Sequence, residues 1–189
     1  MKILALFDID GTILKLKDGR SRIIFSDIMF DVFGKNIHPA HLPNFAGMTD
    51  LQILNELSVL IGVPFRYIHR NIDVVYEKLL NVFRNFCNEE HIVILPGVIE
   101  LINNLSKNKD IQLGLLTGNF RDNAYIKIAT YNLARFFPFG AFGSDHRNRN
   151  KLPSIAITRA NKYEGIRIFS RNNTLIIGDG PRDIECAKT

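Results

Sequence analysis

The sequence predicts an α/β fold in which a parallel sheet lies between helices. Two observations support this prediction. Short apolar runs of strand length recur along the chain, and most of them are followed by an amphipathic helical pattern, which is typical of a parallel sheet with helical connections. Residues 15–89 differ because they show only helical patterns and loops. The sequence therefore predicts an all-helical segment inserted into an α/β core.

The composition indicates an ordinary globular protein. Of the 189 residues, 46% are hydrophobic and 23% are charged, which is enough apolar material for a core and argues against disorder. The sequence shows neither an apolar run of membrane-spanning length nor a signal-peptide pattern, so we expect a cytoplasmic protein without a membrane partner. Cys87 and Cys186 have no partners at zinc-binding spacing, and we interpret both as packing residues.

The first predicted strand is followed by two acids. Residues 3–7 form an unbroken apolar run, which suits a strand that is buried on both faces. Side chains two residues apart on an extended chain point to the same side, so Asp8 and Asp10 can converge. Gly11 permits a backbone geometry or a close approach that a side chain would block. Two half-buried acids repel each other, so a divalent cation would be their natural partner.

The segment Asp8-Ile9-Asp10-Gly11-Thr12 resembles the DxDGT signature of the haloacid dehalogenase-like (HAD) superfamily of phosphatases and phosphotransferases. This resemblance implies a Rossmann-like parallel sheet with the Asp8 strand at its centre. It also implies that Asp8 is the nucleophile, that Asp10 donates and accepts protons, and that Gly11 and Thr12 border the substrate. Dehalogenases lack an acid at the position of Asp10 and P-type ATPases carry Thr there, so both classes are disfavoured.

The inserted segment is expected to contain three helices. Apolar spacing predicts a helix over 22–33, a loop over 36–49, a helix that begins near Asp50 and a further helix over 64–86. Resemblance to the phosphoglycolate phosphatase group implies that this segment is a cap over the active site.

The predicted division places residues 1–14 and 90–189 in the core and residues 15–89 in the cap. Within the cap, Gly47-Met48-Thr49-Asp50 resembles a stretch that many capped relatives place over the active site. Gly47 and Thr49 are therefore candidate substrate-binding residues. The alternative is that Thr49 or Asp50 only caps the following helix.

A second strand, over 111–116, ends at Thr117-Gly118-Asn119, just before a predicted helix at 122–134. A hydroxyl and backbone N–H groups at such a position can bind a phosphate, although a helix cap alone would also explain them. The resemblance implies a catalytic role for Thr117 and substrate contacts for Gly118 and Asn119.

The Phe-rich residues 136–142 predict a short buried strand, and a basic stretch follows it. The family places a Lys or Arg after this strand to neutralise the nucleophile and the phosphate. Arg149 is the better candidate because Arg-Asn-Lys-Leu-Pro resembles a phosphoglycolate-phosphatase-like subgroup, and Lys151 is the second. Residues 145–171 carry a net charge of +5, but no stacking aromatic pattern or helix-turn-helix signal marks a nucleic-acid surface.

The last strand, over 174–177, precedes a segment with two acids that resembles the GDxxxD motif of the family. By this resemblance Asp179 would bind a metal and Asp183 would complete its inner or outer shell. Family members commonly continue past the next helix into another strand and helix, whereas this sequence stops at Thr189.

Together these motifs imply a Mg²⁺-dependent phosphatase that acts on a small phosphorylated metabolite through an aspartyl-phosphate. Asp8, the backbone carbonyl of Asp10 and Asp179 would hold the metal, with Asp183 beside them. Two alternatives stay open. One is a phosphotransferase or mutase of the same fold, and the other is a non-catalytic module that binds through the basic stretch at 145–171. Neither the particular phosphomonoester nor the oligomeric state follows from the sequence.

Overall fold

A four-stranded parallel sheet forms the centre of the structure, a computed structural model that describes residues 2–189 apart from the side chains of Asp18 and Pro39. The strand order is β5-β4-β1-β6. The strands are β1 (Ile3–Phe7), β4 (Ile111–Leu116), β5 (Gly140–Ala141) and β6 (Thr174–Ile177). The predicted α/β fold is confirmed, and β1 lies between β4 and β6, as expected.

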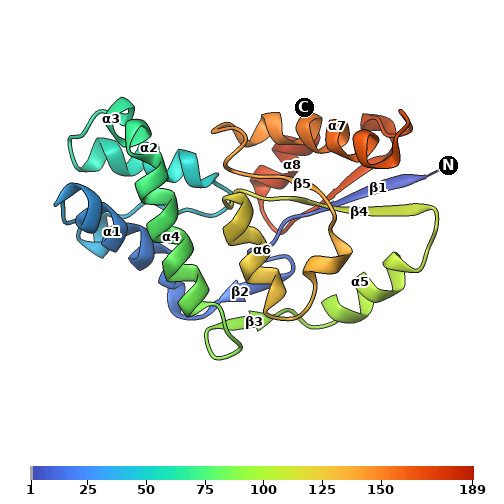
Figure 1. Cartoon of the computed structure of the whole chain (residues 1–189), viewed down its shortest axis with the longest axis horizontal. Coiled ribbons are helices and arrows are strands. Elements are labelled where there is room, and N and C mark those ends of the chain that lie inside the picture. Colours follow the sequence, from blue (N-terminus) through green and yellow to red (C-terminus); the bar gives the residue numbers. More distant parts are fainter. Residues whose placement is uncertain (1) are drawn as a thin grey trace.

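The side chains of β1 pack alternately on the two faces of this sheet. Ala5 and Phe7 join an apolar cluster with α5 (Val98–Ser106) and α6 (Arg121–Ala129). Leu4 and Leu6 join another cluster with α7 (Leu152–Glu164) and α8 (Pro181–Ala187), and Figure 1 shows the two pairs of helices on opposite sides of the sheet. Because both faces are covered, the strand is apolar throughout and shows no alternation in its sequence.

Two further strands join the sheet region to the helical segment. The strand β2 (Leu14–Leu16) pairs antiparallel with β3 (Ile92–Ile94). The expectation of only helices and loops over residues 15–89 is therefore wrong at the start of that segment. The chain leaves and re-enters the core at adjacent places, and the two short connections satisfy each other's backbone groups by pairing. The predicted domain boundaries remain predictions.

Four helices make up the rest of the segment and gather at one end of the molecule (Figure 1). They are α1 (Arg20–Phe33), α2 (Asp50–Leu60), α3 (Phe65–Arg70) and α4 (Ile72–Phe86). The single helix predicted over 64–86 is wrong, because the chain bends at Asn71. The side-chain amide of Asn71 donates to the carbonyl of Tyr67 at 2.9 Å, in competition with the backbone.

The helix predicted over 122–134 ends early, because α6 stops at Ala129. Asn132 then adopts a positive φ of 57°, which a helix cannot continue through. Short 3-10 turns complete the chain: Lys17–Gly19, Pro39–His41, Ala134–Phe136, Arg149–Lys151 and Arg171–Asn173. Within residues 2–189 we find no helix with the length and apolar character needed to cross a membrane.

Candidate functional site

A cavity of about 280 Å³ lies where the carboxyl ends of β1, β4 and β6 face the helical segment. This is the edge at which open parallel sheets bind ligands. Its lining includes most of the residues predicted from the sequence: Asp8, Asp10, Gly47, Thr117, Gly118, Asn119, Arg149, Asp179 and Asp183. Four predicted residues are absent from the lining: Gly11, Thr12, Thr49 and Lys151.

Asp8 is buried next to one cation. The Arg149 guanidinium lies 3.3 Å from Asp8 Oδ2 and 2.5 Å from Asp183 Oδ1, and all three side chains are less than a tenth exposed. Burial raises the pKa of Asp8 to about 6; Arg149 opposes this rise, while Asp183 and Asp10 add to it. Lys151 is exposed. Of the two candidate cations, only Arg149 therefore lies at the buried carboxylate.

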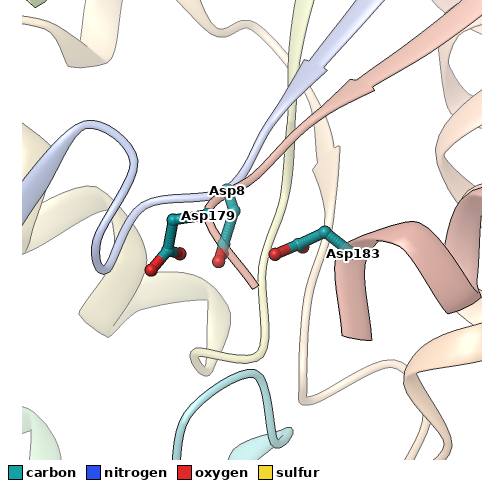
Figure 2. Close-up of side chains that lie close together, drawn as sticks. All are labelled: Asp8, Asp179 and Asp183. Carbon is teal, nitrogen blue, oxygen red and sulfur yellow. The ribbon is translucent and has the colours of Figure 1, made fainter. Parts of the chain in front are cut away.

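Three carboxyl groups gather at the ends of β1 and β6. Oxygens of Asp8, Asp179 and Asp183 lie within 4.8 Å of one another, and Figure 2 shows the three groups around one space. Asp183 accepts bonds from Arg149 and from the N–H of Gly180, whereas Asp179 is exposed. Three acids beside one guanidinium leave an excess of negative charge. The oxygen donors fit a hard divalent cation, with Asp8 and Asp179 as the freer ligands.

Gly11 shows why this turn needs a glycine. Its φ is +90°, and a β-carbon there would overlap the Asp179 carboxyl group. The expected close approach at Gly11 is thus observed, although this residue and Thr12 form the turn rather than the cavity wall. The hydroxyl of Thr12 is buried and has no hydrogen-bond partner among the residues that the structure describes.

The Asp10 carboxyl group is held by a different set of residues. Its two oxygens accept bonds from the Lys127 ammonium at 2.8 and 2.9 Å, and one also accepts from the Asn119 amide at 2.6 Å. Asn119 in turn donates to the Thr117 hydroxyl at 2.9 Å and accepts from Lys127 at 2.6 Å. The strand-end residues Thr117 and Asn119 are thereby connected to Asp10.

Sequence reasoning missed Lys127. This lysine lies on α6 between Ile126 and Ile128, and its side chain is only 3% exposed. A single charge within an apolar stretch is a weak signal, because a lysine on a helix usually reaches solvent. Its role as a partner of Asp10 becomes visible only when α6 is placed against the end of β1.

The start of α2 is bonded to two loops of the core. Thr49 accepts from the N–H of Gln52 at 3.1 Å as the helix cap, and it donates to the carbonyl of Arg147 at 2.6 Å. The Asp50 N–H donates to the carbonyl of Gly118 at 2.7 Å. A β-carbon on Gly118 would overlap the Met48 carbonyl, so the two segments meet without room for a side chain.

Asp50 is a second residue whose place the sequence does not reveal. Its carboxylate is buried and accepts from the N–H of Phe120 at 2.6 Å. Burial raises the pKa of Asp50 to about 7, against the lowering effects of the Phe120 N–H and of Lys127. An Asp in the first turn of a helix is ordinarily exposed, and here the core loop covers it.

The sequence matches the family model for haloacid dehalogenase-like hydrolases over residues 5–189. The chain belongs to this family. The resemblance seen in the motifs is thereby confirmed, and so is the expectation of a hydrolase. No protein of curated function matches the sequence.

Solved structures of the same fold cover nearly the whole chain. CbbY from Rhodobacter sphaeroides, in complex with phosphate, superimposes with a TM-score of 0.71 at 17% identity, covering 100% of this chain and 82% of that one. β-Phosphoglucomutase from Clostridium difficile gives 0.72 at 18% identity, with coverages of 100% and 81%. A provisionally assigned phosphoglycolate phosphatase from Lactobacillus plantarum gives 0.64 at 21%, with coverages of 100% and 83%. At these identities the likeness concerns the fold.

Proposed function

We propose that this protein is a Mg²⁺-dependent phosphatase that hydrolyses a small phosphomonoester through an aspartyl-phosphate. The observation that carries the proposal is the buried Asp8 in the cavity, 3.3 Å from Arg149, with the carboxyl group of Asp10 also in the lining. One acid would attack phosphorus and the other would exchange protons. Membership of the hydrolase family supports the same conclusion.

In the first step an Asp8 oxygen forms a bond to phosphorus while the ester P–O bond breaks. The bonding electron pair leaves with the ester oxygen, which takes a proton from the Asp10 carboxylic acid, so that Asp10 becomes a carboxylate. In the second step water attacks phosphorus and gives a proton to Asp10, and the bond to Asp8 breaks with its electron pair returning to the carboxylate. Inorganic phosphate is released, and both acids regain their starting states.

The remaining residues of the site would stabilise the phosphoryl group. Arg149 can neutralise negative charge beside Asp8, and Thr117 and Gly118 line the cavity where a hydroxyl and an N–H can share phosphate oxygens. Asp8 and Asp179 would hold Mg²⁺ together with the Asp10 carbonyl, while Asp183 orients Arg149 and the turn at Gly180. The metal would offset the charge that otherwise repels the phosphate.

The substrate is proposed to be a phosphocarboxylate, as in a phosphoglycolate phosphatase-like enzyme. Arg182 lines the cavity, and one terminal nitrogen of its guanidinium group is buried without a hydrogen-bond partner among the described residues. A carboxylate of the substrate would satisfy this nitrogen. The comparison to make is kcat/KM for 2-phosphoglycolate against 2-hydroxyethyl phosphate, which lacks the carboxylate, in the wild type and in Arg182→Met. If the ratio of the two kcat/KM values is the same in the wild type and in Arg182→Met, the proposed phosphocarboxylate substrate is contradicted.

The decisive test of the phosphatase activity is Asp8→Asn, assayed with p-nitrophenyl phosphate and a panel of phosphorylated metabolites with and without Mg²⁺. The amide keeps the shape of the side chain but loses the attacking charge, so turnover should vanish while the melting curve remains. Asp27→Asn on α1 is the matched control, because Asp27 is exposed. Labelled phosphate that still attaches to the Asp8 variant would reject the assignment, and added sugar phosphates would reveal a transferase.

A further inference from the structure

Lys127 is a charged residue whose side chain is almost completely buried. It lines the cavity, yet its side chain is only 3% exposed, whereas Asp10 is 41% exposed. Removing an ammonium from water is unfavourable, and buried ion pairs contribute little net stability compared with well-packed apolar residues. Apolar residues in place of the whole Lys127–Asp10 pair would therefore serve the fold as well. The cation is explained better by what it does to Asp10.

The contacts of Lys127 fix the orientation of the Asp10 carboxyl group. Both Asp10 oxygens are bonded to the ammonium, and the Asn119 amide binds one of them as well. Without these donors, a side chain that is two-fifths exposed would be free to rotate about its bonds. Proton transfer to a leaving group requires an oxygen at hydrogen-bond distance in the right direction. Lys127 and Asn119 restrict the carboxyl group to one direction.

The same ammonium also contacts the helical segment. It lies 5.1 Å from the ring centroid of Phe83, a residue of α4 that is 2% exposed. A cation over an aromatic face is attracted to it, more strongly where water is excluded. Lys127 therefore has one partner at the end of β1 and another on α4, so its position depends on α4 staying against the core.

We propose that Lys127 is a positioning residue that holds Asp10 in the orientation needed for proton transfer, and that Phe83 makes this orientation depend on the helical segment. The inference rests on the proposed phosphatase function, since it assigns a role within that reaction. In this role Lys127 acts through Asp10 and not on the reacting atoms. Its effect should be confined to steps in which Asp10 moves a proton.

The experiment compares Lys127→Met, Lys127→Arg and Phe83→Leu with the wild type on two substrates. Formation of the aspartyl-phosphate from p-nitrophenyl phosphate needs little acid help, because p-nitrophenolate leaves unprotonated. Lys127→Met should therefore release a first equivalent of p-nitrophenolate at nearly the wild-type rate, and then turn over slowly because water activation is impaired. On β-glycerophosphate, a poor leaving group, kcat should fall about 100-fold.

Two variants test the physical origin of the effect. Lys127→Arg keeps the charge and can donate to both Asp10 oxygens, so it should recover part of the lost kcat. Phe83→Leu keeps an apolar side chain but removes the aromatic face, so it should show the same substrate-dependent loss to a smaller degree. Lys162→Met is the matched control, because Lys162 is an exposed lysine on the core helix α7.

The outcomes separate this inference from the proposed function. If Lys127→Met slows the first-turnover release of p-nitrophenolate as much as it lowers kcat on β-glycerophosphate, or if its kinetics are unchanged, the positioning role is overturned. If Phe83→Leu has wild-type kinetics on both substrates, the link to α4 is overturned. An active wild type with an inactive Asp8→Asn upholds the phosphatase proposal whatever Lys127→Met does. An inactive wild type overturns that proposal, and the inference with it.

Discussion

Replacing the buried acid Asp50 with Asn should stabilise the protein at neutral and higher pH. The Asp50 carboxyl group is enclosed between the start of α2 and the loop at Phe120, and burial raises its pKa from 3.8 to about 7. An Asn side chain can still accept the hydrogen bond from the Phe120 N–H through its carbonyl oxygen. The substitution therefore removes the cost of the charge and keeps the bond.

The sign and size of this effect follow from proton linkage. Between pH 4 and 7 the folded protein holds the Asp50 proton that the unfolded chain has lost, so the free energy of unfolding falls as pH rises through this window. A shift of about three pKa units, at about 1.4 kcal/mol each, makes the full loss about 4 kcal/mol above pH 7. The Asn variant should not show this loss. For a chain of this length, the difference corresponds to a melting temperature about 10 °C higher.

The measurement is thermal unfolding of the wild type and Asp50→Asn from pH 4 to pH 8, with Asp27→Asn as an exposed control. The two curves should nearly coincide at pH 4 and separate steadily toward pH 8. The raised pKa of Asp8 gives its own slope, but this slope is common to both proteins and cancels in the difference. Parallel curves across the whole range, or an Asn variant that is less stable at pH 8, would refute the reasoning.

Three further results are expected. Arg149→Met should abolish turnover, because it leaves Asp8 and Asp183 buried without their shared cation. Lys151→Met, the control, should change kcat little. Similar effects of the two substitutions would reject Arg149 as the functional cation. EDTA should stop turnover and Mg²⁺ should restore it. Ca²⁺ should be a poor substitute, because the larger ion tolerates more oxygen ligands and can engage both oxygens of the nucleophile. Full activity in EDTA would reject the requirement for a metal ion. Thr49→Ala removes a helix cap and should lower the free energy of unfolding by about 1 kcal/mol, as measured by urea denaturation. Altered kinetics without any loss of stability would instead indicate that Thr49 contacts the substrate.

The sequence was sufficient where a local pattern has one physical outcome. The apolar run before Asp8 had to be a covered strand. The acids at the ends of β1 and β6 were expected to meet because the family resemblance implied that these strands are neighbours, and parallel neighbours end at the same edge of a sheet. The left-handed backbone at Gly11 was equally local. These features depend on a few adjacent residues and on strand order.

The features that escaped prediction depend on contacts between distant segments. Lys127 meets Asp10 from 117 positions away along the chain, and Phe120 covers Asp50 across 70 positions. Neither pairing has a periodic signal. The break at Asn71 was also missed, because a side-chain amide that bonds to a nearby carbonyl overrides a continuous apolar stripe.

The position of Phe120 bears on how substrate enters. This ring belongs to a loop of the core, yet it is 1% exposed within the apolar cluster of α1 to α4, where it packs 5.4 Å from the ring of Tyr76. Separating the helical segment from the core would expose the ring to water, at a cost of about 2–3 kcal/mol for a side chain of this size. The ligand-free enzyme should therefore spend most of its time closed. Capture of substrate would then be limited by the small fraction of open molecules, and the observed association rate should stay well below that of a permanently open site.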